Sequence, residues 1–165
     1  MLVGHSYGGM VATGVADRAR DRVTQLIYID AFVPGDGQSL IDLNEVARPG
    51  MQELKASGEW RMPPNPTPPD TSPADQEWLS TRRVQMPIKC FETRLKLQGG
   101  ALTLPRSYIY ATRITPQDTF GQFATMTKND PAWRYYEIDA SHSPNVTAPE
   151  ALTALLTKIA AEPTR

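Results

Sequence analysis

The sequence contains very few of the residues that form disulfides or bind metal ions. Its 165 residues include one cysteine, Cys90, and two histidines, His5 and His142. A single cysteine cannot form an internal disulfide, and its presence is compatible with a reducing compartment, so we expect a cytoplasmic protein. No cluster of cysteine and histidine is visible, and the sequence therefore predicts neither a metal site nor a cofactor.

Charge and hydrophobicity exclude further classes of partner. The net charge is −1, from 17 Lys and Arg against 18 Asp and Glu, and no basic stripe is visible, so nucleic acid is not an expected partner. The sequence has no run of 18 apolar residues and no charged-then-apolar N-terminal signal, so we expect no association with a membrane. Its length and hydrophobic content of 40% predict a single domain over residues 1–165.

The most informative motif is Gly-x-Ser-x-Gly, formed by Gly4-His5-Ser6-Tyr7-Gly8. An apolar pair, Leu2-Val3, precedes the motif, and residues 10–17 are typical of a helix that turns small side chains toward a sheet. This order predicts a nucleophile elbow, a sharp turn from a strand to a helix with a serine at its apex. Glycines are needed there because the serine backbone is strained and larger neighbours would clash. The alternative is a glycine-rich turn without a chemical role.

A serine hydroxyl becomes a good nucleophile only when a base removes its proton. His5 precedes the serine, and its side chain should point away from the hydroxyl, which leaves His142 as the base by elimination. His142 follows a predicted strand at 133–138 and precedes an amphipathic helix that begins at Pro149-Glu150. Its position after the last strand favours the role of base, and a surface-loop histidine is the alternative.

The acid that orients the histidine has several candidates. Asp30 closes the apolar run 23–29, Asp118 lies in the loop after the next predicted strand, and Asp139 precedes the histidine closely. We expect Asp30, because its strand should be parallel and adjacent to the strand of Ser6, so that both carboxyl ends meet at one sheet edge. Asp118 is the alternative acid, and Asp139 is expected to shape its loop.

These features resemble the α/β-hydrolase superfamily, and most of all the group of plant methylesterases, hydroxynitrile lyases and bacterial esterase relatives. The resemblance covers essentially the whole chain and rests on Gly4–Gly9, Tyr28–Pro34, Tyr108–Tyr110 and His142. It implies an α/β fold with a mainly parallel sheet flanked by helices. In many relatives the acid shortly follows the strand at 107–112, where this sequence has Ile114. Other members, such as some haloalkane dehalogenases, carry the acid where Asp30 stands.

The resemblance also implies that the chain is the C-terminal part of the fold. The resembled fold has an elbow after the fifth of eight strands, whereas here the elbow stands at the N-terminus. One oxyanion-hole N–H would then be missing, and that of Tyr7 would remain. The strand at Leu2-Val3 would form an exposed apolar edge, through which two copies could associate as a homodimer.

Residues from about 35 to 103 are expected to form a cap insertion over the site. Helical stretches at 40–54 and 74–83 flank an extended, proline-rich centre at 62–70. A disordered linker is the alternative, and the cap aromatics could instead form the core of the cap. The candidate substrate-binding residues are His5 and Phe32 beside the elbow, and Trp60, Trp78, Met86 and Phe91 in the cap.

The predicted function is that of a serine esterase acting on small carboxylic esters. Ser6 would attack the ester and form an acyl-enzyme, His142 would move the proton, and Asp30 would orient the imidazole. A hydroxynitrile lyase is one alternative, although lyases of the resembled group usually carry a lysine after the catalytic histidine, where this chain has Ser143. A catalytically silent half-domain that acts as a binding or assembly module is another.

Overall fold

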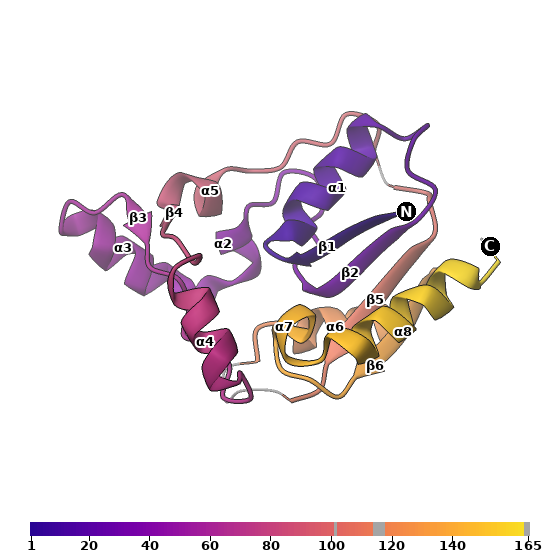
Figure 1. The fold of residues 1–165 in the computed structure, drawn as a ribbon. Helices are drawn as coiled ribbons and strands as arrows, with labels where there is room; N and C mark the ends of the chain where they lie inside the picture. The colour runs from indigo at the N-terminus through magenta and orange to yellow at the C-terminus, as the bar shows by residue number, and fades with distance from the viewer. Residues whose placement is uncertain (101, 114–117, 164–165) are drawn as a thin grey trace.

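Four parallel strands form the centre of the protein in the computed structural model, which describes residues 1–100, 102–113 and 118–163. The strand order is β1 (Leu2–Ser6), β2 (Leu26–Ala31), β5 (Arg106–Ala111) and β6 (Trp133–Ile138). Helices lie on both sides of this sheet (Figure 1). The predicted fold class, a mainly parallel sheet flanked by helices, is confirmed.

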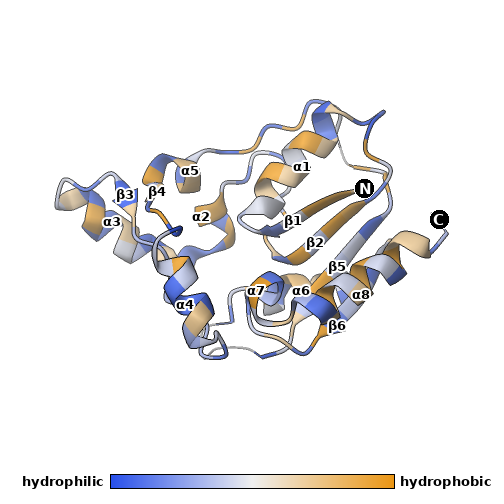
Figure 2. Cartoon of the chain, in the orientation of Figure 1, coloured by the Kyte–Doolittle hydropathy of each residue, from blue (hydrophilic) through white to orange (hydrophobic). Residues whose placement is uncertain are grey.

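The two faces of the sheet bury different side chains, and β2 shows the alternation most clearly. Leu26 and Tyr28 pack on the face covered by α1 (Gly8–Arg18) and α6 (Gly121–Lys128). Ile27 and Ile29 pack on the opposite face against α8 (Pro149–Ala161). A strand that is apolar at every position is typical of a parallel sheet covered on both sides. Figure 2 shows the resulting band of apolar residues along the strands.

Parallel pairing brings the carboxyl ends of the strands to one edge of the sheet. His5 on β1 lies opposite Ile29 on β2, and Tyr28 lies opposite Tyr108 on β5. Among the described residues, β1 pairs with β2 alone, and Val3 is 39% exposed. The functional site is therefore expected where β1 and β2 end.

The segment between β2 and β5, expected to be a cap and called the cap below, has its own apolar cluster. Ile41, Met51 and Ile88 are buried together in it, and the proline-rich stretch 63–69 has no regular structure. The helix expected at 40–54 is divided at Asn44 into shorter pieces. The elements are α2 (Leu40–Leu43), η1 (Glu45–Ala47), α3 (Arg48–Ala56), β3 (Arg61–Met62), α4 (Pro73–Ser80), β4 (Met86–Pro87) and α5 (Ile88–Glu92).

The return of the chain from the cap is fixed by a buried aspartate on α1. The Asp17 carboxylate accepts the N–H groups of Gln98 at 2.6 Å and Gly99 at 3.1 Å. It also accepts a hydrogen bond from Arg20 at 2.7 Å. The Arg20 hydrogen bond and then that of Gln98 lower the pKa of Asp17 from 3.8 to about 2. Because the folded pKa is the lower one, this anchor is fully present above about pH 3.8 and is lost as the pH falls toward 2.

A short helix, α7 (Pro144–Thr147), links the end of the sheet to α8. Within the part of the chain that the structure describes, no helix has the length and apolar character needed to cross a membrane.

The start of α1 permits a test of how closely that helix packs against the sheet. A Cβ built on Gly9 would overlap the carbonyl oxygen of Phe32, whereas one on Gly8 would meet no atom within 4 Å. We expect Gly9→Ala to lower the free energy of unfolding by about 1–3 kcal/mol or more, because backbone cannot give way easily. Gly8→Ala is the matched control and should be neutral or stabilising, since alanine favours helix. Urea unfolding of both variants would decide, and equal stabilities would contradict the close approach.

Candidate active site

Ser6 stands at the point where β1 ends and the chain turns into α1. Its φ of 55° is left-handed, which costs a non-glycine residue on the order of 1–3 kcal/mol. The Phe32 N–H donates to the Ser6 carbonyl at 3.2 Å and supports this turn. A Cβ on Gly4 would lie 2.6 Å from the Gly8 carbonyl oxygen, so the motif glycine lets the strand and helix approach. The strand–turn–helix predicted around Ser6 is present.

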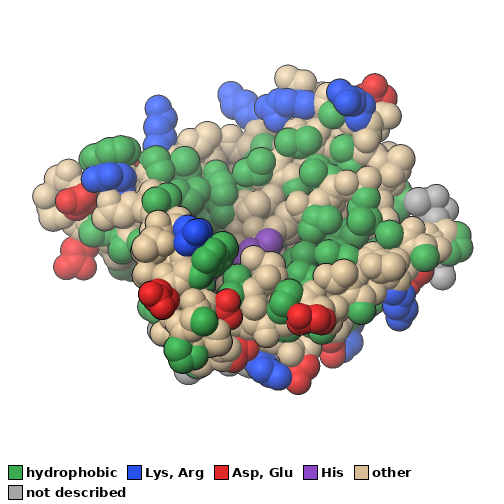
Figure 3. All heavy atoms as spheres, viewed as in Figure 1, with side chains coloured by type: hydrophobic (Ala, Val, Ile, Leu, Met, Phe, Trp, Pro, Cys, Tyr) green, Lys and Arg blue, Asp and Glu red, His purple; other side chains and the backbone are tan. Residues whose placement is uncertain are grey.

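The structure brings Ser6, His142 and Asp30 into one hydrogen-bonded chain. The Ser6 Oγ lies 2.9 Å from His142 Nε2, and His142 Nδ1 lies 2.7 Å from Asp30 Oδ2. A carboxylate only accepts hydrogen bonds, so Nδ1 donates to Asp30 and Nε2 is left to accept the serine hydroxyl. The Asp30 side chain is 6% exposed and that of His142 31%. Figure 3 shows histidine atoms at the bottom of a hollow in the molecular surface.

A β-bulge turns Asp30 toward the histidine. The register between β1 and β2 shifts after His5, so that Ser6 pairs with Ala31 rather than with Asp30. Asp30 has a φ of 40°, the second left-handed non-glycine residue among those described. Bulges commonly redirect a side chain at active sites. The other carboxylate oxygen, Oδ1, accepts a hydrogen bond from the Ala111 N–H at 3.4 Å.

The other candidate acids have different partners. Asp118 accepts hydrogen bonds from the Tyr110 hydroxyl at 2.6 Å and from the N–H groups of Phe120 and Gly121 at the start of α6. Asp139 binds Arg113 at 2.8 Å. Ile114, at the position where the family resemblance places the acid, lies outside the described residues. Asp30 is thus the candidate that reaches the histidine.

Phe120 lies against the face of the His142 imidazole, a contact that sequence reasoning missed. The two rings are stacked, with centroids 4.7 Å apart and planes inclined by 8°. Phe120 in turn packs edge-on against Phe32, at 5.1 Å. Nothing local in the sequence marks Phe120, because it precedes α6 and meets the histidine only through the tertiary fold. Together the rings restrict the orientation of the imidazole.

The loop that carries His142 is held by two further side chains. His5 Nε2 lies 2.5 Å from the His142 carbonyl oxygen, and the two rings are 4.8 Å apart. The Ser141 N–H donates to Asp70 Oδ2 at 3.2 Å. Asp70 belongs to the cap and also lies 3.5 Å from Arg113. The loop is therefore tied both to β1 and to the cap.

The cap reaches the elbow through Tyr7 and α5. The Tyr7 hydroxyl donates to the carbonyl oxygen of Cys90 at 3.4 Å, and its ring packs 6.3 Å from that of Phe91. Burial raises the pKa of the Tyr7 phenol, which therefore stays protonated near neutral pH. Among the described cap aromatics predicted to bind substrate, Phe91 is the one that contacts a residue of the elbow, Tyr7.

The remaining candidate substrate-binding residues occupy other positions. Phe32 is 4% exposed and belongs to the core behind the elbow. Trp60 and Trp78 are 61% and 51% exposed, and each lies under a neighbouring arginine guanidinium. Met86 lies in β4, opposite Met62. The roles of these side chains in substrate binding stay predictions.

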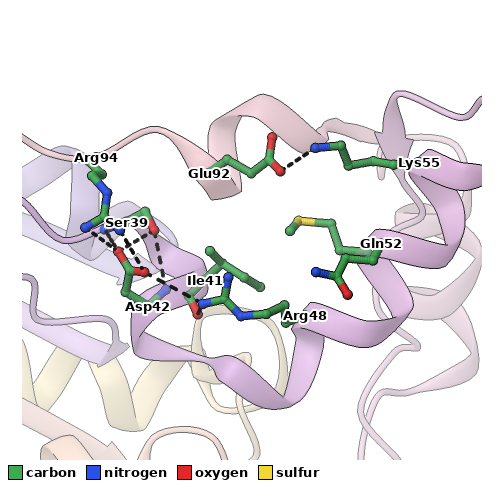
Figure 4. Close-up of a pocket in the computed structure, with 9 residues that line it drawn as sticks. Ser39, Ile41, Asp42, Arg48, Gln52, Lys55, Glu92 and Arg94 are labelled. Atoms are coloured by element: carbon green, nitrogen blue, oxygen red, sulfur yellow. Dashed lines mark hydrogen bonds and ion pairs between the residues drawn. The ribbon is translucent and has the colours of Figure 1, made fainter.

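A polar pocket lies within the cap, and Ser6, Asp30 and His142 are not among the residues that line it (Figure 4). Its charged side chains pair with one another, Arg94 with Asp42 at 3.0 Å and Lys55 with Glu92 at 2.6 Å. Mutual pairing leaves these charges partly neutralised, and the pocket contains no histidine. In the described residues, no group of three or more His, Cys, Asp or Glu side chains is arranged to hold a metal ion.

A serine elbow with a histidine and a carboxylate, all at the carboxyl edge of a parallel α/β sheet, defines a site of the α/β-hydrolase type. A family model for the alpha/beta hydrolase family matches residues 1–155. The chain belongs to this family. The predicted relationship to the plant methylesterase group and its bacterial relatives is confirmed by two of the proteins that the chain resembles, at 34% and 27% identity.

Among curated proteins, the chain is 34% identical over 168 residues to the carbendazim hydrolyzing esterase of Nocardioides sp. strain SG-4G. The match covers 94% of this chain and 69% of the relative. This likeness, the family match and the 27% identical hydrolase described below place the chain with the carboxylic ester hydrolases of the family.

Among solved structures, the chain is similar to an extracellular alpha/beta-hydrolase from a Paenibacillus species, at a TM-score of 0.75 and 27% identity, over 96% of this chain and 71% of that chain. That hydrolase is described as sharing structural and functional homology with tobacco salicylic acid binding protein 2. Polyneuridine aldehyde esterase has the same fold at a TM-score of 0.67 and 16% identity, over 97% of this chain and 71% of that chain. A pyrethroid hydrolase from Sphingobium faniae JZ-2 also has this fold, at a TM-score of 0.62 and 23% identity, over 98% of this chain and 71% of that chain.

Proposed function

We propose that this protein hydrolyses small carboxylic esters through a Ser6–His142–Asp30 triad and an acyl-enzyme. The observation that carries the proposal is the continuous hydrogen-bonded chain from the Ser6 hydroxyl through the imidazole to the Asp30 carboxylate. In this mechanism His142 Nε2 takes the serine proton while Oγ attacks the ester carbonyl carbon. The proton then passes to the leaving alkoxide, which departs as an alcohol and leaves an acylated serine.

Water completes the cycle by the same groups in reverse roles. His142 Nε2 takes a proton from a water molecule, which attacks the acyl carbon, and the carboxylic acid leaves as Ser6 regains its proton. Asp30 keeps the imidazole in the tautomer with hydrogen on Nδ1 and stabilises the imidazolium when it forms. Its burial and its second contact, at the backbone of Ala111, favour a fixed orientation for this task.

The oxyanion of the tetrahedral intermediate requires a donor beside Ser6. Tyr7 directly precedes α1, where backbone N–H groups lack acceptors within the helix. We assign the Tyr7 N–H to the oxyanion, because it follows the nucleophile as the elbow requires. One such donor typically contributes about 10²–10³ in rate.

The substrate class follows from the side chains next to the triad. Phe120 lies against His142, and Phe91 lies against Tyr7, so apolar aromatic surface borders the reacting groups. Esters with an apolar aromatic part suit such a surface. The 34% identical relative is named for the hydrolysis of carbendazim. We would therefore test carbendazim together with aryl and methyl esters in one panel of substrates.

Replacement of the nucleophile tests the proposal directly. Ser6→Ala should remove nearly all hydrolysis of an aryl ester such as p-nitrophenyl acetate, because no acyl-enzyme can form. A fluorophosphonate probe should label the unmodified protein once, at Ser6, as read by mass spectrometry of its peptides. Circular dichroism and the melting temperature provide the control for folding. Full activity in folded Ser6→Ala, or labelling at another residue, would contradict the proposal.

Two aspartates with different hydrogen-bond partners give a matched pair of variants. Asp30→Asn should lower kcat by several orders of magnitude, up to about 10⁴, because the amide favours the wrong imidazole tautomer. Asp118→Asn should change kcat little, since Asp118 contacts Tyr110 and the start of α6 instead. Steady-state kinetics of both variants would decide. A large loss of kcat in Asp118→Asn, with Asp30→Asn active, would show that Asp118 supplies the acid.

Folded protein that hydrolyses no member of the panel and takes no fluorophosphonate label would favour the binding-module alternative. Cyanide release from mandelonitrile without ester hydrolysis would favour the lyase.

A further inference from the structure

The proposed mechanism uses one of the two histidines and leaves the other without a role. His5 lies on β1, one residue before the nucleophile, with its ring beside that of His142. Its Nε2 atom lies 2.5 Å from the carbonyl oxygen of His142, although the two residues are 137 positions apart in the chain. The contact therefore joins the strand of the nucleophile to the main chain of the base.

The protonation of His5 follows from its surroundings. Burial, and then the neighbouring His142, lower the pKa of His5 below 6.5, while the hydrogen bond to the His142 carbonyl and the Asp30 carboxylate act in the opposite sense. His5 is therefore neutral near pH 7 and carries one N–H. A carbonyl oxygen can only accept a hydrogen bond, so the hydrogen is on Nε2. His142 needs the opposite tautomer, with hydrogen on Nδ1, to bind Asp30.

We propose that His5 is a positioning residue whose Nε2–H holds the main chain of His142, so that the imidazole stays between Ser6 and Asp30. The catalytic consequence rests on the proposed function, whereas the hydrogen bond does not. Asp70 holds the same loop one residue earlier, because it accepts the Ser141 N–H at 3.2 Å. With His5 at the His142 carbonyl and Asp70 at the Ser141 N–H, the backbone from which the imidazole extends is fixed at two adjacent residues.

This role is distinct from the substrate binding that the sequence suggested for His5. A residue that holds the base affects turnover, whereas one that binds the substrate affects KM more strongly. It also differs from simple packing, because only a donor at the Nε2 position satisfies the His142 carbonyl. A misplacement of about 1 Å in a catalytic group can cost about 10²-fold in rate.

Two substitutions separate these roles by the position of one nitrogen. The side-chain amide of glutamine places an N–H group near the Nε2 position of histidine, and that of asparagine places one near Nδ1. His5→Gln should therefore retain the bond to the His142 carbonyl, and His5→Asn should lose it while remaining polar and smaller. We expect kcat to fall about 10–10²-fold in His5→Asn with KM little changed, and to stay within a few-fold of the unmodified protein in His5→Gln.

The test that does not depend on activity is nitrogen NMR of protein labelled with ¹⁵N-histidine. The full chain has two histidines, so the spectrum contains two imidazoles, and the His5 variants assign them. We expect His5 to be neutral with hydrogen on Nε2 from pH 8 down to about 6.5, and His142 to carry hydrogen on Nδ1. The His142 signals should be kept in His5→Gln and shifted or broadened in His5→Asn.

The two measurements distinguish the failure of this inference from that of the proposed function. If His5 carries its hydrogen on Nδ1 alone, or if folded His5→Asn leaves the His142 signals unchanged, the positioning role is overturned. If the protein hydrolyses no ester but the expected tautomers are found, the proposed function fails and the hydrogen bond stands. If His5→Asn does not fold, the tautomer in the unmodified protein and the kcat of His5→Gln decide.

Discussion

The site depends on two residues with left-handed backbone near the carboxyl ends of neighbouring strands. Ser6 and Asp30 both have positive φ, and the register shift between β1 and β2 sets them side by side at one sheet edge. Each such residue costs on the order of 1–3 kcal/mol and persists only where the surrounding structure fixes it. Three features hold Ser6 and Asp30 in this conformation. They are the close packing of α1 at Gly9, the hydrogen bond from the Phe32 N–H to the Ser6 carbonyl, and the buried strands around them.

Much of this arrangement could be predicted because its signals are local. Gly4 marks a close approach of strand and helix that a side chain would block, whereas the space expected to be closed at Gly8 is open. The apolar run before Asp30 marks a strand buried on both faces. The choice of Asp30 required one more step, that the two strands are adjacent and parallel, and the pairing of β1 with β2 has this form. The β-bulge was not visible in the sequence, although it is what turns the Asp30 carboxylate to the histidine.

The parts that could not be predicted are contacts between distant segments. Phe120 precedes a helix that has no motif, Asp70 closes a proline-rich stretch, and both meet the loop of His142 only in the folded chain. The tryptophans attracted attention as large apolar side chains, yet they lie more than half exposed beside arginines. Size and hydrophobicity indicate what can line a site, whereas the path of the chain determines what does.

The attachment of the cap to the base loop is electrostatic and lies near the surface. Asp70 binds the Ser141 N–H and faces Arg113, whose side chain is 53% exposed and also pairs with Asp139. Dissolved ions screen such exposed pairs, with a screening length near 8 Å at physiological ionic strength and about 3 Å at 1 M. Salt therefore acts on the tether between cap and loop more strongly than on the buried Asp30. The ionic strength of the medium becomes a means of loosening the contact between the cap and the loop of His142 while the reacting groups remain in place.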